Sequence, residues 1–60
     1  MFIELIKVVN TYARPVLINV NRINYIYQCV DGHTNIAFDD DTITVKNSIG
    51  QVHNMLNGVK

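Results

Sequence analysis

The chain is poor in the residue types that carry most catalytic and metal chemistry. It has one cysteine, Cys29, and two histidines, His33 and His53. A single cysteine excludes a disulfide within the chain, and these three side chains cannot supply a four-ligand zinc site of the usual spacing. Neither histidine lies near a serine in a recognisable catalytic arrangement. We therefore expect no metal, no cofactor and no enzymatic activity, and we interpret both histidines as surface or structural residues.

Glycine and long apolar runs are scarce as well. The three glycines, Gly32, Gly50 and Gly58, are widely separated, which excludes a glycine-rich phosphate-binding loop. No apolar run approaches the ~20 residues that a transmembrane helix needs, so we expect no membrane insertion. The apolar N-terminal stretch carries Glu4 and Lys7 and lacks the small-residue cleavage site of a secretion signal. A lone cysteine without an export signal predicts a cytoplasmic protein.

The small size of the chain limits its stability. Sixty residues form one domain at most, here taken as 1–60. A domain of this size buries only about 60% of the surface that its unfolded chain exposes. Hydrophobic residues make up 48% of the chain, which argues against disorder. Because neither a disulfide nor zinc can supplement the core, self-association remains, and we predict a homo-oligomer.

Alternating apolar residues and turn signals predict a small antiparallel sheet of about five strands. The first strand is apolar on both faces, which is typical of a central strand or of one covered by a neighbouring subunit. Residues 10–14 are expected to connect it to a second strand, with Pro15 at a strand start or edge because proline cannot donate to a ladder. Asparagines within 19–22 predict a tight bend or a bulge, and Asp31-Gly32 predicts a hairpin turn. The expected strands are 2–9, 16–20, 23–30, 34–38 and 42–45.

A capped helix at about 48–57 completes the expected fold, which is α+β and mainly β. Asn47 or Ser48 can accept hydrogen bonds from the first turn, and Gly58 can supply a left-handed stop. Such a short helix is not stable alone in water, so its apolar stripe must dock on its own sheet or on a neighbouring chain. The expected core comprises Ile3, Leu5, Val16, Ile18, Ile23, Ile26, Ile36, Phe38, Val45, Ile49, Val52 and Leu56.

Two further features invite a chemical interpretation. Cys29 shares a strand face with Tyr25 and Tyr27, but no adjacent cation or helix start is apparent that would stabilise its thiolate, so a small core residue is the interpretation. The run 39–41 consists of three aspartates, yet the central glycine and the later glutamate of a calcium loop are missing. We interpret the run as a charged hairpin turn that also discourages edge-to-edge aggregation.

Candidate contact residues fall into two sets. The first thirty residues have a net charge of +2 and the last thirty a net charge of −2, a polarity that could guide subunit contact. A nucleic-acid interface, the alternative, would use Lys7, Arg14 and Arg22 with Tyr25 or Tyr27, since single-strand binders place aromatic rings in a basic groove. The predicted partner or self-association surface comprises Phe2, Ile6, Val8, Tyr25, Tyr27 and Met55.

At PVLINVNRINYIYQC and IAFDDDTITVKNSIGQVHNML, the chain resembles the flagellar FlbD/SwrD small-protein family. Members share an "IN…I..I" core, paired strands around an acidic or glycine turn, and a "V..S...V" entry into a final helix. This chain departs from the family in its aromatic segment 25–29. Over about 15–45 the chain also resembles LytTR-type DNA-binding domains, although most of their basic contact residues are absent. Together with the residue analysis, the resemblance implies a small interaction or regulatory protein, bacterial or phage-encoded, that binds a protein partner. The residues that carry the first resemblance are Ile18, Asn19, Ile23, Ile26, Val45, Ser48 and Val52.

Overall fold

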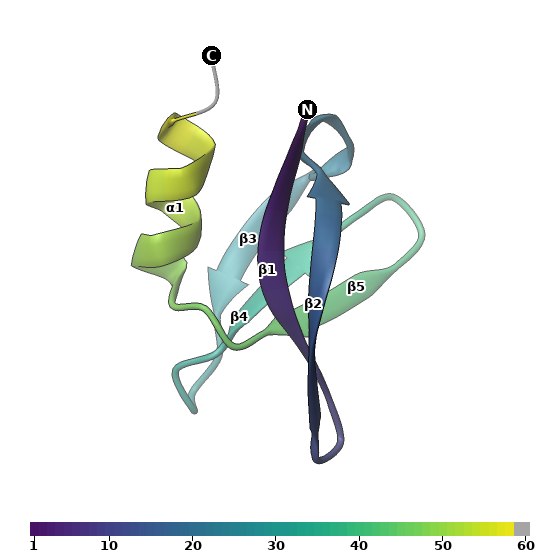
Figure 1. The fold of residues 1–60 in the computed structure, drawn as a ribbon, viewed down its shortest axis with the longest axis vertical. Helices are drawn as coiled ribbons and strands as arrows, with labels where there is room; N and C mark the ends of the chain where they lie inside the picture. Colours follow the sequence, from purple (N-terminus) through teal and green to yellow (C-terminus); the bar gives the residue numbers. More distant parts are fainter. Residues whose placement is uncertain (59–60) are drawn as a thin grey trace.

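The computed structural model describes residues 1–58 and contains a five-stranded antiparallel sheet with one C-terminal helix (Figure 1). This arrangement confirms the α+β, mainly β fold class. The strand order is β2-β1-β5-β4-β3, so the first strand lies inside the sheet, between β2 and β5, which agrees with the first of the two arrangements expected for it. The elements are β1 (Phe2–Val9), β2 (Tyr12–Asn19), the 3-10 helix η1 (Val20–Arg22), β3 (Tyr25–Gln28), β4 (Thr34–Ala37), β5 (Thr42–Val45) and α1 (Ile49–Asn57).

The first hairpin is longer than expected. β2 begins at Tyr12, so the connection predicted at 10–14 is wrong and only Asn10 and Thr11 form the turn. Asn10 has a φ of 54°, in the left-handed region that asparagine tolerates better than most residues. This conformation reverses the chain within two residues, which lets residues 12–14 join the strand.

Pro15 lies within β2 rather than at its start, and β2 is an edge strand. Its register partner on β1 is Ile6. The Ile6 N–H donates to Asn47 Oδ1 over 2.9 Å, and the Ile6 carbonyl accepts from the Lys46 N–H over 2.7 Å, so both groups face away from β2. Opposite residues in such a pair exchange no hydrogen bonds. The N–H that proline lacks would therefore face the free edge, and the ladder loses nothing.

Two connections shorten the strands around them. The bend predicted at 19–22 is the helix η1, Val20–Arg22, and Asn19 Oδ1 accepts from the Asn21 N–H over 3.1 Å to cap it. After β4, the Phe38 N–H donates to the Asp41 carbonyl over 2.8 Å and closes the 39–41 turn. Phe38 therefore belongs to the turn, which corrects the strand predicted at 34–38.

β3 is only four residues long, against the eight predicted at 23–30. At its start, the Ile23 N–H donates to the Val20 carbonyl over 3.3 Å, so Ile23 caps η1 instead of joining the strand. At its end, the Cys29 N–H donates to the His33 carbonyl over 2.7 Å, and the Gly32 N–H donates to the Cys29 carbonyl over 3.1 Å. Gly32 has a φ of 90°, which glycine adopts without strain. The predicted turn at Asp31-Gly32 is present, but it begins earlier than expected.

The helix α1 has a complete N-terminal capping box. Ser48 Oγ accepts from the Gln51 N–H over 3.2 Å, and Gln51 Oε1 accepts from the Ser48 N–H over 2.9 Å. Gly58 ends the helix, as expected, but not in the left-handed conformation. Its φ of −76° is right-handed, and its N–H donates to the Asn54 carbonyl over 3.1 Å.

The core lies between the sheet and α1, on the side of the sheet that we call the inner face. Ile49, expected in the core, is only half-buried and lies outside the core cluster, whereas Thr34 and Ala37 are buried without having been expected. Thr34 Oγ1 donates to the Asn47 carbonyl over 2.9 Å, which offsets the cost of burying a hydroxyl. Five other expected core residues pack against the cluster while partly buried: Val16, Ile23, Ile26, Phe38 and Leu56. The buried cluster consists of Ile3, Leu5, Ile18, Ile36, Val45 and Val52.

The sheet is strongly bent between its two parts. β1 and β5 share a single register pair, Lys7 with Val45. The β1–β2 hairpin crosses in front of the β3–β5 meander (Figure 1). α1 packs against both β1 and β3, which are separated by two strands in the sheet order. The helix docks on its own sheet, and the bend brings both parts of the sheet to it.

Candidate functional site

A groove of about 500 Å³ runs along β2, between inner-face residues such as Ile18 and Ile43 and opposite-face residues such as Phe2 and Leu17, and no residue of α1 lines it. It is shallow and open to solvent rather than enclosed. Its walls come from β1, β2, η1, β5 and the turn between β4 and β5. The lining residues are Phe2, Lys7, Val16, Leu17, Ile18, Asn19, Arg22, Phe38, Asp40, Asp41 and Ile43.

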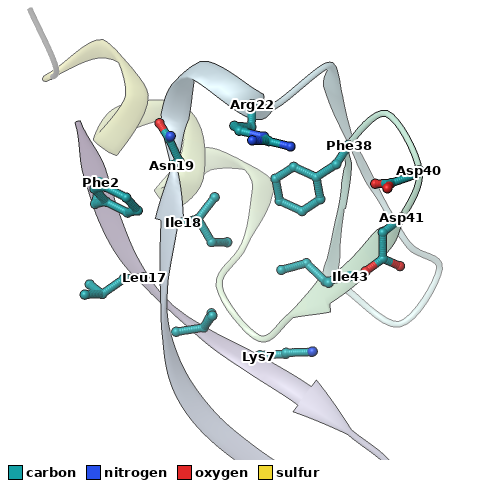
Figure 2. A pocket seen from close by; sticks show the side chains of 11 residues that line it. Phe2, Lys7, Leu17, Ile18, Asn19, Arg22, Phe38, Asp40, Asp41 and Ile43 are labelled. Carbon is teal, nitrogen blue, oxygen red and sulfur yellow. The ribbon is translucent and has the colours of Figure 1, made fainter.

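The middle of the groove is apolar. Ile18 and Ile43 approach each other from β2 and β5, and the ring of Phe38 lies beside them (Figure 2). Ile18 is buried, whereas Ile43 and Phe38 are only half-buried. Phe2 and Leu17 lie on the other side of β2 from Ile18 in this view. The groove therefore offers apolar surface that the chain leaves partly uncovered.

Charged side chains surround this apolar middle. Lys7 lies at one end and Arg22 at the other, while Asp40 and Asp41 project from the β4–β5 turn (Figure 2). Across residues 1–58, no ion pair joins these four groups. Their charges remain available to a bound molecule.

The aspartate run forms the charged hairpin turn that the sequence predicts. Asp39 Oδ1 accepts from Asn24 Nδ2 over 2.9 Å, and Asp41 Oδ1 accepts from the Thr42 N–H over 2.8 Å. These two carboxylates therefore hold the turn in place. Asp40 is exposed and lines the groove.

The predicted partner surface is distributed over three elements. Phe2 is exposed on β1, and Ile6 and Val8, which share its face by alternation, are half-buried. Tyr25 and Tyr27 are exposed on the edge strand β3, and their rings stack with centroids 6.1 Å apart. The sixth residue, Met55, is exposed on α1.

The residues of the alternative nucleic-acid surface are only partly brought together. Lys7 and Arg14 are direct register partners on β1 and β2, so their side chains emerge side by side. Arg22 lies at the far end of the groove from Lys7 (Figure 2). Tyr25 and Tyr27 do not line the groove. Of the three cations, Lys7 and Arg22 line the groove without the two aromatic rings expected beside them.

The histidines take part in local contacts. His33 Nδ1 lies 3.2 Å from Asp31 Oδ2, and the His33 N–H donates to Asp31 Oδ1 over 3.0 Å, so this pair stabilises the β3–β4 turn. His33 is half-buried, within the surface or structural role expected for it. His53 is exposed on α1, with its Nε2 3.3 Å from Asn57 Nδ2.

Sequence reasoning missed three residues. Leu17 is exposed and lines the groove, and the alternation around buried Ile18 could have shown that it points the other way. Tyr12 was assigned to a connection, although it lies on β2. Asn47 was considered only as a helix cap, whereas its side chain accepts the Ile6 N–H and joins β1 to the segment after β5. No local pattern signals that long-range bond.

Within the described part of the chain, no group of three or more His, Cys, Asp or Glu side chains is placed to hold a metal ion. The helix in residues 1–58 is too short and too polar to cross a membrane. Comparison with protein-family models, with curated proteins and with solved structures finds no match for the chain.

Proposed function

We propose that this protein is a small non-enzymatic interaction and regulatory protein, bacterial or phage-encoded, that acts through protein–protein contact as a homo-oligomer. Its location would be the cytoplasm of a bacterial cell or, for a phage-encoded protein, of the host. The supporting observation is the amount of large apolar side chain left exposed on so small a fold. The exposed residues are Met1, Phe2, Val9, Tyr12, Leu17, Tyr25, Tyr27, Val30 and Met55.

Several of these side chains adjoin one another rather than being scattered. Phe2 pairs in register with Asn19 and Glu4 with Leu17, so Phe2 and Leu17 are diagonal neighbours on one face of the hairpin. Both also line the groove. Contiguous exposed apolar surface on a soluble domain is typical of a protein-binding site.

The shape of the groove favours binding over catalysis. Reactive sites usually lie in concave pockets with a few convergent polar groups. Here the groove is open, and Lys7 and Arg22 lie at opposite ends of an apolar floor. Such a surface is suited to holding another polypeptide by side-chain burial and peripheral charge.

Sedimentation equilibrium from micromolar to millimolar protein tests the proposal. We expect the mean mass to rise with concentration, and Phe2→Ser to weaken the association. The matched control is Val30→Ser, because Val30 is fully exposed in the β3–β4 turn and does not line the groove. A monomer at every concentration would rule out self-association.

Partner binding is tested with a tagged protein in a native lysate at mild salt. We expect a stoichiometric protein partner that Phe2→Ser releases and Val30→Ser retains. Repeated recovery of the tagged protein alone would contradict partner binding.

The second candidate function is nucleic-acid binding, favoured by the adjacent Lys7 and Arg14 on a two-stranded hairpin. A β-ribbon of this kind fits the major groove of DNA. Binding would weaken steeply with added salt, and Lys7→Gln with Arg14→Gln would reduce the slope by roughly one per lost phosphate contact. Lys46→Gln, on the exposed residue after β5, is the control. A mobility-shift assay at low salt that shows no complex would eliminate this candidate.

A further inference from the structure

We infer that the protein forms a twofold dimer in which the tip of the β1–β2 hairpin of each subunit lies in the groove of the other. We call residues 7–14 the arm. The inference rests on the self-association in the proposed function and names the occupant of the groove, a second copy of this chain.

The arm extends beyond the rest of the sheet. β1 is paired with β5 only at Lys7, whereas its pairing with β2 continues as far as Val9 and Tyr12. Beyond Lys7 the two strands therefore pair only with each other. Figure 1 shows the turn of this hairpin projecting past the other strands.

One face of the arm is both apolar and cationic. Val9 is the register partner of Tyr12, and Lys7 is the register partner of Arg14. Opposite residues share a face, and so do alternate residues along a strand, so these four side chains lie together on the continuation of the inner face. Val9 is 47% exposed and Tyr12 65% exposed, so the apolar part of this face is largely uncovered.

One wall of the groove has the complementary character. Ile18, Ile43 and Phe38 provide apolar surface, and Asp40 and Asp41 provide negative charge where they project from the β4–β5 turn, while the cations Lys7 and Arg22 lie at the two ends of the groove. The arm, by contrast, contains no acidic residue. Across residues 1–58, no ion pair joins Arg14 to the carboxylates of the groove, so this complementarity is not used within one subunit.

Lys7 belongs to both regions, because it lines the groove and begins the arm. The two regions are therefore parts of one continuous face, with the cationic arm at one end and the acidic wall along the groove. A twofold rotation about an axis in the plane of the interface, perpendicular to the line that joins the two ends of this face, places each end of the face on the opposite end of the second copy. In that arrangement Arg14 faces Asp40 and Asp41 of the other subunit, while Tyr12 and Val9 cover the exposed edges of Ile43 and Phe38.

The area required also favours reciprocal contact. A stable interface of standard size buries roughly 800 Å² per partner, which is about a fifth of the 4280 Å² that this chain exposes. One arm of eight residues is too small to supply this area alone. Twofold symmetry doubles each arm–groove contact and brings the combined area closer to that requirement.

Side-by-side pairing of two β2 edges is the main competing dimer. The backbone of Pro15 faces that free edge, and proline has no N–H to donate, so the row of edge donors is interrupted in the middle of the strand. The structure therefore favours contact through side chains on the inner face over addition of strands at this edge.

Charge reversal with rescue tests the inference. Arg14→Glu and Asp40→Arg should each raise the dimer dissociation constant at least roughly tenfold, because each places like charges together. The double variant, Arg14→Glu with Asp40→Arg, should restore most of the affinity. Lys46→Glu carries the same change in charge as Arg14→Glu on an exposed residue that does not line the groove, and should leave the affinity unchanged.

Sedimentation equilibrium measures each affinity, and circular dichroism confirms that each variant is folded. Tyr12→Ser should also weaken the dimer, because it removes a ring that covers apolar residues of the other subunit. The variant should still fold, because Tyr12 is mostly exposed within one subunit. A dimer that neither single charge reversal affects, or one that both weaken without rescue, would overturn the arm–groove arrangement while leaving self-association intact. A wild-type protein that is monomeric at every concentration would instead overturn the proposed self-association itself.

Discussion

The inner face of the sheet has two halves that differ in what covers them. On one half, α1 packs Val52 against Leu5, Ile36 and Val45, and all four side chains are at most 1% exposed. On the other half, no residue of α1 lines the groove, and Ile43 and Phe38 remain half-buried. A helix of nine residues is about 13 Å long, whereas the longest extent of the molecule is 33 Å. The helix can therefore cover only part of the inner face. The covered half stabilises the fold, and the uncovered half is available for binding.

The largest expected effect lies in the covered half. Leu5→Ala removes a fully buried side chain and should lower the free energy of unfolding by about 2–5 kcal/mol, a large part of the ~5–15 kcal/mol typical of a domain. Ile43→Ala, in the groove, should cost less than half as much because Ile43 is only half-buried. Urea unfolding at low micromolar protein measures both. Equal losses of unfolding free energy in the two variants would show that the groove half contributes as much to stability as the covered half.

The next effect concerns the hydrogen bond from the Ile6 N–H to Asn47 Oδ1, which joins β1 to the segment between β5 and α1. Asn47→Ala leaves the partly buried Ile6 N–H without an acceptor and should cost about 1–3 kcal/mol. Asn47→Asp retains the accepting oxygen and should remain within roughly 0.5 kcal/mol of wild type. Thermal or urea unfolding distinguishes the two. If the aspartate variant is destabilised as much as the alanine variant, the hydrogen bond is not the cause.

A smaller effect is expected at the helix cap. Ser48→Ala removes the hydroxyl of the capping box and should cost about 1 kcal/mol. Ser48→Asp retains an accepting oxygen and should be close to wild type. Amide hydrogen exchange should show faster exchange in α1 and in the residues that it covers on β1, β4 and β5, but little change in β2, which lines the groove. Equally faster amide exchange in all five strands would mean that loosening α1 destabilises the whole sheet and not the covered half alone.

The smallest effect on stability is expected at the groove. Leu17→Ala truncates a side chain that is 65% exposed and should change the free energy of unfolding by no more than about 0.5 kcal/mol. The same variant should weaken self-association, measured by sedimentation equilibrium. A loss of stability comparable to that of Ser48→Ala would place Leu17 among the folding residues rather than the binding residues.

Local signals predicted some elements well. The bounds of β1 and β5 agree with the expectation, because alternation and flanking turn residues are sufficient for short strands. Ser48 was one of two expected caps, and Gln51 completes a box that depends only on neighbouring residues. By contrast, the start of β2 depends on the positive φ of Asn10, and the end of β3 depends on a bond between Cys29 and His33. Neither has a strong sequence signature.

The candidate surfaces show a similar division. Lys7, Arg14 and Arg22 were identified from charge, but their placement followed from the register of one hairpin and from the position of η1. The groove combines residues from Phe2 to Ile43, so no local window contains it. Tyr12 was missed for a different reason, because the start of β2 was placed too late, and Leu17 was missed although the alternation around Ile18 indicates that it points away from the core.

The sequence by itself determined the class of fold, the approximate number of strands, the position of the capped helix and the absence of a disulfide within the chain. These properties follow from local periodicity, capping chemistry and the residue count. Only the tertiary structure decided the strand order, the bend at Lys7 and Val45, and the extent of the inner face that α1 covers. The reason is physical: cover depends on where a helix about 13 Å long lies relative to strands distant in sequence, and such distances are not encoded in any local pattern.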